Sequence, residues 1–290
     1  MSGALPPFVW LDGALVPTAE ARVSPYDRGL MLGDGLYETV RVSAGRGFRT
    51  AAHVARLAKS AAWLGLAFDA DARVWEERFR ALVEANGLAH GEARVRITLT
   101  RGTGGHVAES AGLAPTVIIT SDPLPPDVDA REQAGIAAWP VRLMRHPDFA
   151  AHKTIALTPS VLAHRTMRAR GGDERDEPLF VHPDGWLLEG ATSNLFVVRR
   201  DGRLCTPPLS RPLLPGITRA ALLELRPDAL ETDLRAEDLE GAREAFCTRS
   251  TRGVSPIVRV AQTPVGDGLP GPETLALRAA YAALVERELR

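Results

Sequence analysis

Lysine is nearly absent from this chain of 290 residues. Lysine and arginine together number 35, yet only Lys59 and Lys153 are lysine, and the rest are arginine. The amine of lysine can lose its proton and attack a carbonyl carbon, whereas the guanidinium of arginine stays charged. A chain that avoids lysine so strongly retains one either by accident or where arginine cannot replace it.

The chain also contains few cysteines and has almost no net charge. The two cysteines, Cys205 and Cys247, lie in unrelated contexts without a CxxC pair, which predicts a reduced, cytoplasmic protein. The net charge is −1, so no general basic field attracts nucleic acid or an anionic membrane. No apolar run approaches membrane-spanning length, and the first ten residues lack the pattern of a signal peptide. We expect no nucleic-acid partner, no membrane partner and no metal site.

The composition instead suits a globular protein. Hydrophobic residues make up 45% of the chain and charged residues 24%, and 290 residues suffice for two domains. Residues 121–131 hold three prolines and no hydrophobic period, as linkers do. We therefore expect a small α+β domain over residues 1–125, a linker at 126–131 and a second domain over 132–290.

Hydrophobic periodicity and turn residues predict the elements. In the first domain we expect strands at 8–16 (a hairpin), 37–42, 93–100 and 116–120, with helices at 50–64 and 73–86. In the second we expect a strand at 135–143, hairpins at 179–189 and 194–205, a strand at 244–248, and helices at 159–170, about 217–225 and 273–289.

The two lysines differ in their surroundings. Lys59 lies on a helix with an apolar stripe, as an ordinary solvated lysine does. Lys153 lies in a mainly apolar segment, which favours the neutral, nucleophilic amine. Lys153 is therefore the candidate for a Schiff base with a carbonyl compound, with an accidental lysine as the alternative.

Other features of the chain suit one cofactor, pyridoxal 5′-phosphate, which needs an amine, a carboxylate for its ring nitrogen and a cradle for its phosphate. Glu189 ends an apolar strand and is the candidate carboxylate; its alternative is a strand-end acid facing water. Residues 216–218 (GIT) begin a helix, where backbone N–H groups favour phosphate, although many such helices bind nothing.

Further side chains are candidates for the phosphate. Ser250 and Thr251 follow a strand and offer hydroxyls, with turn capping as the alternative. The guanidinium of Arg56 offers two parallel charge-assisted hydrogen bonds; the alternative is that Arg56 lies on a solvated helix face.

Several motifs of one family occur in the expected order. They are residues 27–39 (DRGLMLGDGLYET), His53-x-x-Arg-Leu57, Lys153, 189–196 (EGATSNLF) and 214–219 (LPGITR). Together they resemble the class IV aminotransferases, the fold-type IV pyridoxal-phosphate enzymes. This family includes branched-chain and D-amino-acid aminotransferases, some (R)-amine transaminases and 4-amino-4-deoxychorismate lyase.

The resemblance implies a fold and a set of roles. It implies an α+β fold with a small α/β sandwich domain and a larger pseudo-barrel domain, the cofactor in the cleft, and a homodimer. Lys153 matches the Schiff-base lysine and Glu189 the partner of the pyridine nitrogen. The phosphate contacts match Arg56, Ile217, Thr218 and Ser250.

The implied reaction is transamination between an amino acid and a 2-oxo acid through a Lys153 aldimine. The alternative is 4-amino-4-deoxychorismate lyase, which releases pyruvate and leaves 4-aminobenzoate. A non-catalytic protein that binds phosphate or pyridoxal is a third alternative, which the retention of Lys153 disfavours.

Substrate contacts are predicted less directly. Tyr37 and Thr251 are candidates, and Thr158 stands where similar branched-chain enzymes usually carry tyrosine. The loop at 101–106 (RGTGGH) ends in His106, where D-amino-acid enzymes and the lyase place arginine nearby. His106 is therefore either a pH-dependent carboxylate trap or a plain loop histidine. Arg28 is either a second carboxylate partner or structural.

Overall fold

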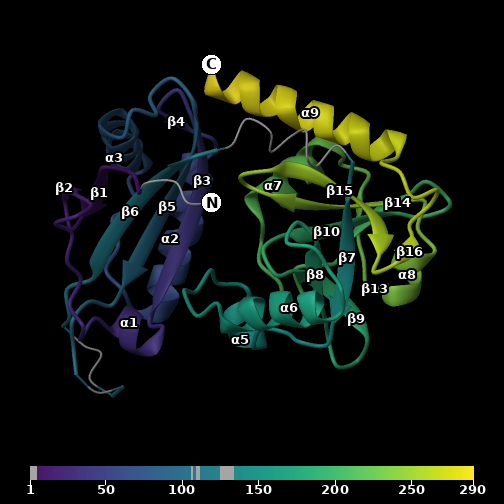
Figure 1. Ribbon diagram of the computed structural model, residues 1–290, viewed down its shortest axis with the longest axis horizontal. Coiled ribbons are helices and arrows are strands. Elements are labelled where there is room, and N and C mark those ends of the chain that lie inside the picture. Colours follow the sequence, from purple (N-terminus) through teal and green to yellow (C-terminus); the bar gives the residue numbers. More distant parts are fainter. Residues whose placement is uncertain (1–4, 106, 109–111, 125–133) are drawn as a thin grey trace. The chain divides into compact units, whose positions relative to one another are not determined.

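The computed structural model describes residues 5–105, 107–108, 112–124 and 134–290 (Figure 1). The chain divides into two compact units. The first comprises Met1–Pro125 with His152–Ala156 and Glu288–Arg290, and the second comprises Pro126–Ala151 and Leu157–Arg287. The predicted linker at 126–131 lies outside the described residues, and the predicted domain boundaries stay a prediction.

The first unit is an antiparallel sheet in the order β2-β1-β6-β5-β3-β4, with helices (Figure 1). Its elements are β1 (Phe8–Leu11), β2 (Ala14–Pro17), α1 (Arg28–Leu32), β3 (Gly35–Ser43), β4 (Arg46–Gly47), α2 (Thr50–Leu64), α3 (Ala72–Ala85), β5 (Glu92–Thr100) and β6 (Thr116–Pro123). The predicted strands and the two longer helices lie within three residues of the sequence prediction, the largest difference being the end of β6 at Pro123 instead of residue 120. The short helix α1 was not predicted.

The core of the first unit lies between β3, β5 and the helices α2 and α3. Side chains from one face of β3, including Val40 and Val42, meet Leu57 of α2 and Phe79 of α3 in one buried cluster. Alternation in β3 therefore leaves Tyr37 and Thr39 on the opposite face of the sheet.

A segment distant in sequence extends this sheet. Residues 153–155 pair with the start of β3: the Tyr37 N–H donates to the Lys153 carbonyl at 2.8 Å, and the Ile155 N–H donates to the Gly35 carbonyl at 3.0 Å. Leu36 and Thr154 form the antiparallel bridge between them. The backbone of Lys153 is thereby fixed beside Tyr37.

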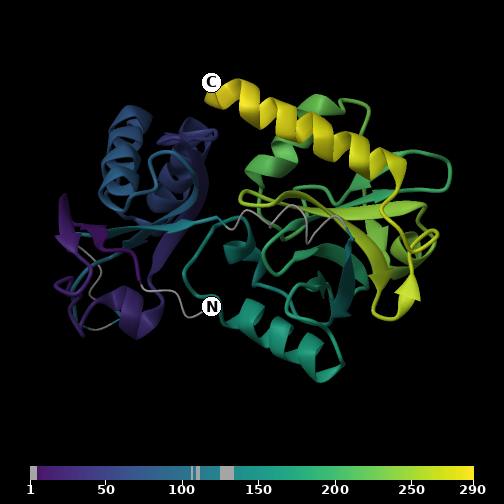
Figure 2. The ribbon, with the colours of Figure 1, turned by 45° about the horizontal axis from the view of Figure 1, so that its top comes forward.

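The second unit contains a sheet that closes on itself (Figure 2). Its elements are β7 (Ile136–Val141), α5 (Pro147–Ala150), α6 (Thr158–Ala169), β8 (Glu177–Val181), β9 (Trp186–Gly190), β10 (Asn194–Val198), β11 (Leu204–Thr206), α7 (Ile217–Leu225), β12 (Leu230–Glu231), β13 (Leu234–Arg235), α8 (Ala236–Glu240), β14 (Glu244–Arg249), β15 (Gly253–Val260), β16 (Thr263–Pro264) and α9 (Pro272–Leu289). The strand order β10-β14-β15-β7-β8-β9 is joined end to end by the pairing of Asn194 with Glu189.

Both cysteines, Cys205 and Cys247, are free and buried in the core of this ring, among Leu179, Leu195 and Ile257. In the described part of the chain, no helix combines the length and apolar character that crossing a membrane requires.

Candidate active site

Lys153 belongs to the first unit and lies against the ring of Tyr37. Its Nζ is 4.3 Å from the ring centroid, and the side chain is half-buried. Among the described residues, Lys153 has no ion-pair partner. Lys59 is exposed on α2, as predicted. The lysine that the tertiary structure holds in place is therefore Lys153.

A second cation, Arg96 of β5, lies over the same ring. Its Cζ is 3.9 Å from the Tyr37 centroid, and its Nε donates to the Thr98 hydroxyl at 3.2 Å. Burial lowers the pKa of Arg96. Sequence reasoning missed Arg96, although alternation along β5 places it on the face of Tyr37.

Arg56 lies in a buried group of charged residues on the other face of β3. Its Nε and Nη2 donate to the two carboxylate oxygens of Glu38 at 2.7 and 2.8 Å. His53 Nδ1 lies 2.8 Å from the Glu38 oxygen that Nη2 also contacts. Burial lowers the pKa of His53, so the ring is neutral near pH 7 and donates from Nδ1. The alternative of a solvated helix face is wrong for Arg56, because its side chain is 9% exposed.

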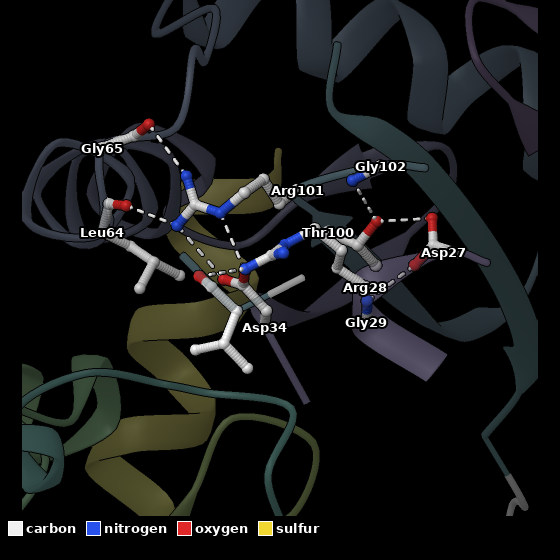
Figure 3. Close-up of polar contacts among 10 residues, drawn as sticks. Asp27, Arg28, Gly29, Asp34, Leu64, Gly65, Thr100, Arg101 and Gly102 are labelled. Carbon is white, nitrogen blue, oxygen red and sulfur yellow. Dashed lines mark hydrogen bonds and ion pairs between the residues drawn. The ribbon is translucent and has the colours of Figure 1, made fainter. Parts of the chain in front are cut away.

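Arg28 is a buried component of a different cluster (Figure 3). Its Nε donates to Asp34 at 2.9 Å, and Arg101 donates to the same carboxylate at 2.8 Å. Arg101 also donates to the carbonyls of Leu64 and Gly65, where helix α2 ends. Arg28 thus has the structural role that the sequence left open. A further role in substrate binding stays a prediction, and His106 lies outside the described residues.

Glu189 in the second unit is 4% exposed, so the alternative of an acid facing water is wrong. One of its oxygens accepts from the Leu214 N–H at 3.0 Å and from Asn194 Nδ2 at 3.3 Å. The other oxygen forms an ion pair with Arg145. Sequence reasoning missed Arg145. A buried carboxylate needs such compensation, because desolvation strongly disfavours an isolated charge.

The start of α7 lacks a side-chain cap. Gly216 is the N-cap residue and, having no side chain, makes no capping hydrogen bond to the start of the helix. A Cβ at Gly216 would lie 1.9 Å from Oδ1 of Asn194, so only glycine fits there. Uncapped N–H groups and the helix dipole favour an anion at Ile217 and Thr218.

Tyr281 of α9 lies close both to this helix start and to the turn between β14 and β15. Its hydroxyl lies 3.4 Å from the Thr218 hydroxyl. Its ring would lie 2.9 Å from a Cβ at Gly253, which shows how closely the turn approaches. Ser250 and Thr251 are half-buried in that turn.

These residues fit pyridoxal 5′-phosphate. Lys153 offers an amine without an acidic partner among the described residues, and Glu189 offers a buried carboxylate. The start of α7 offers N–H groups without a side-chain cap, beside a glycine that packs directly against Asn194. Thr248, just before the turn, has a buried hydroxyl without a partner in the described part of the chain. Of the predicted residues, Tyr37, Arg56 and Lys153 belong to the first unit, and Glu189, Ile217, Thr218, Ser250 and Thr251 belong to the second.

A family model described as amino-transferase class IV matches residues 35–260. The chain belongs to this family. The chain is 26% identical over 284 residues to a D-alanine aminotransferase of Staphylococcus aureus (strain COL), and the match covers 96% of this chain and 98% of that protein. A solved branched-chain amino acid aminotransferase of Escherichia coli matches with a TM-score of 0.87 and 28% identity, covering 96% of this chain and 94% of that one.

A third relative bears on the cofactor. A branched-chain amino acid aminotransferase of a T.th. strain, solved with pyridoxamine 5′-phosphate, matches with a TM-score of 0.84 and 26% identity, covering 96% of this chain and 93% of that one. The predicted family, fold-type IV architecture and cofactor are therefore confirmed for this class IV chain. It is an enzyme of amino-acid transamination, and the relatives do not favour the lyase alternative.

Proposed function

We propose that Lys153 is the lysine through which this aminotransferase holds pyridoxal 5′-phosphate and exchanges amino groups between an amino acid and a 2-oxo acid. The observation that carries the proposal is the position of Lys153. Its backbone is paired to β3, its amine lies 4.3 Å from the Tyr37 ring, and no carboxylate pairs with it among the described residues. A fixed amine without a counter-ion suits covalent attachment to an aldehyde and transfer of a proton.

When bound, the cofactor supplies an electron-withdrawing ring that stabilises the charge developing at the substrate Cα. The amine of Lys153 would act as the base that accepts the proton from the substrate Cα. Once protonated, it would act as the acid that donates this proton to the cofactor carbon bonded to the substrate nitrogen, which regenerates the neutral amine. Glu189, which accepts hydrogen bonds from Leu214 and Asn194 and pairs with Arg145, would hold a proton on the ring nitrogen.

The phosphate contacts come from two sets of donors. Arg56 offers charge-assisted N–H donors. Ile217 and Thr218 offer the uncapped start of α7, and Ser250 adds a hydroxyl. A phosphate dianion matches this donor set because its oxygens accept hydrogen bonds, and the set consists of a cation, backbone N–H groups without a cap and a hydroxyl.

The amino-acid substrate is proposed from the relatives and from two positions. D-alanine and branched-chain amino acids are the substrates in the relatives' names, so small apolar amino acids of either hand are the first candidates. Tyr37, beside the amine, is the proposed wall of the substrate site, and Thr251 a polar contact. Thr158 begins α6 where similar branched-chain enzymes usually carry tyrosine, which favours substrates other than the branched-chain ones.

A panel of substrates tests the activity. The purified protein with cofactor is mixed with L- and D-alanine, L- and D-leucine or L- and D-glutamate, each with a 2-oxo acid acceptor, beside aminodeoxychorismate alone. The proposal predicts amino transfer from at least one amino acid. Release of 4-aminobenzoate without any amino-acid half-reaction would contradict it.

The proposed assembly is a homodimer in the cytoplasm. Apolar side chains around α1 are exposed, with Tyr26 at 66%, Leu30 at 71% and Met31 at 53%. Contiguous apolar surface of this kind marks an interface. Sedimentation should give twice the chain mass for the wild type and one chain mass for Leu30→Asp/Met31→Asp. A matched control is Leu269→Asp, at an apolar residue of the second unit that is 67% exposed.

A further inference from the structure

Glu38 is a fully buried carboxylate whose two oxygens both accept hydrogen bonds. One oxygen accepts from Arg56 Nε at 2.7 Å, and the other accepts from Arg56 Nη2 at 2.8 Å and from His53 Nδ1 at 2.8 Å. The relative exposure of Glu38 is 0%. Two parallel bonds between a carboxylate and a guanidinium fix the plane of the guanidinium as well as its position.

The carboxylate itself is fixed by the sheet. Glu38 lies in the middle of β3, opposite Ile97 of β5, on the face that packs against α2. Arg56 and His53 lie three residues apart on α2 and so project from the same side of that helix. The strand and the helix both pack into the buried core of the first unit. The carboxylate of Glu38 and the imidazole of His53 are therefore held in place beside the guanidinium.

An arginine that must meet a phosphate benefits from such a partner. An unrestrained arginine side chain loses up to about 2 kcal/mol of rotamer entropy when it binds an anion. Less is lost when the guanidinium is already held in the binding orientation. A guanidinium has five N–H donors, more than one carboxylate engages, so a second anion can share it.

We propose that Glu38 is a positioning residue for cofactor binding: it holds the guanidinium of Arg56 in the orientation that the phosphate of pyridoxal 5′-phosphate requires. The proposal rests on the phosphate contact proposed for Arg56. Glu38 acts through Arg56 and does not touch the cofactor.

The charge of the group supports this role. Burial alone would raise the pKa of Glu38, but the charge of Arg56 holds that pKa well below its usual range. Because His53 is neutral, the negative charge of Glu38 is balanced by the positive charge of Arg56 alone. The N–H of His53 donates a hydrogen bond to the carboxylate without adding a second positive charge. The pair therefore supplies geometry to the phosphate more than net charge.

The test compares two ligands that differ only in the phosphate. The apoprotein is titrated with pyridoxal 5′-phosphate and with pyridoxal, and the ratio of the two dissociation constants gives the phosphate preference. Variants Arg56→Ala, Glu38→Asp and Glu38→Gln are measured beside the wild type. The matched control is Glu92→Gln, which removes a carboxylate paired with Arg41 on the same sheet.

Arg56→Ala should lower the phosphate preference about 30-fold, the size of a lost charge-assisted hydrogen bond. Glu38→Asp keeps the charge but shortens the side chain by one methylene, and Glu38→Gln removes the charge. Both should lower the preference about tenfold, because both disturb the fork. Glu92→Gln should keep the wild-type ratio.

The outcomes separate the two proposals. If Arg56→Ala leaves the ratio unchanged, the phosphate contact of Arg56 is wrong and the role of Glu38 falls with it. If Arg56→Ala lowers the ratio while Glu38→Asp and Glu38→Gln do not, only the role of Glu38 is overturned. A loss of affinity for both ligands alike, with an unchanged ratio, indicates a purely structural carboxylate and also overturns the role of Glu38.

Should Glu38→Gln fail to fold, the double variant Glu38→Gln/Arg56→Gln removes both charges together. Its ratio should equal that of Arg56→Ala, and a clearly lower ratio would contradict action through Arg56.

Discussion

At the scale of single residues, the second unit surrounds one carboxylate with donors. Glu189 is buried and accepts from a backbone N–H, an amide side chain and a guanidinium. These donors compensate the charge of a carboxylate that is buried away from water, and such a carboxylate suits a position opposite a protonated ring nitrogen.

Glu189→Gln should therefore lower kcat by on the order of 100-fold, comparable with removing one electrostatic contact to a transition state. The substituted amide cannot hold the proton on the ring nitrogen, whereas Lys153 and the phosphate donors still bind the cofactor. Steady-state kinetics with the best amino-acid donor and absorbance after dialysis measure both effects. Asp233→Asn, which removes a carboxylate paired with Arg211 in the same unit, is the control. A variant with the wild-type kcat would contradict the role of Glu189.

Residue roles differed in how well the sequence predicted them. Lys153 stood out because lysine is so rare, and Glu189 because it ends an apolar strand in a family motif. Arg96 and Arg145 gave no comparable signal, and Glu38 was not singled out although it lies within the motif at 27–39. Their charges are common in this chain, and the partners that give them a role lie far away in sequence.

At the scale of elements, the start of α7 depends on one missing side chain. Gly216 has a negative φ of −68°, so the backbone there suits any residue, and only the 1.9 Å approach of Asn194 excludes a Cβ. The glycine is thus required by contact and not by conformation.

Gly216→Ala should lower the free energy of unfolding by about 1–3 kcal/mol, the usual effect of overpacking. It should also weaken cofactor binding about tenfold, because Asn194 or the helix start must move. Urea unfolding and cofactor titration measure the two effects. Gly91→Ala is the control, since nothing lies within 4 Å of a Cβ there. Unchanged cofactor affinity in Gly216→Ala would contradict a phosphate site at α7.

The elements were predictable where turn residues and periodicity agree. The Pro-Asp-Gly and Asp-Gly turns gave the hairpins that became β8–β9 and β10–β11. Helix α1 was missed because glycines surround its five residues, and its cap depends on Asp27 accepting from the Gly29 N–H. The closure of the ring by Asn194 and Glu189 is a contact that no local pattern encodes.

At the scale of the whole molecule, buried titratable groups make stability depend on pH. Burial lowers the pKa of His53 and of His152 from 6.5. Below pH 6.5 the unfolded chain therefore binds protons that the folded chain does not, and stability falls as the pH falls. Glu38, with a pKa held below its usual 4.5, adds a further loss at lower pH.

The free energy of unfolding of the apoprotein should be constant near pH 7–8 and fall between pH 6.5 and 5, by up to about 1.4 kcal/mol per pH unit for each histidine. Urea unfolding at several pH values measures this. His152→Phe keeps the stack on Trp63, whose ring centroid lies 3.9 Å away, and removes one titrating group. Its profile should be shallower than that of the wild type. A wild-type profile that is flat or rises toward pH 5 would contradict the account.

The most direct test of the account is to locate the covalent bond to the cofactor. The holoenzyme is reduced with borohydride, digested and analysed by mass spectrometry, together with Lys59→Arg and Lys153→Arg. With only two lysines in the chain, the assignment is unambiguous. The account predicts the pyridoxyl mass on the peptide containing Lys153 in the wild type and in Lys59→Arg, and none in Lys153→Arg. Labelling of Lys59, or retention of the label in Lys153→Arg, would contradict it.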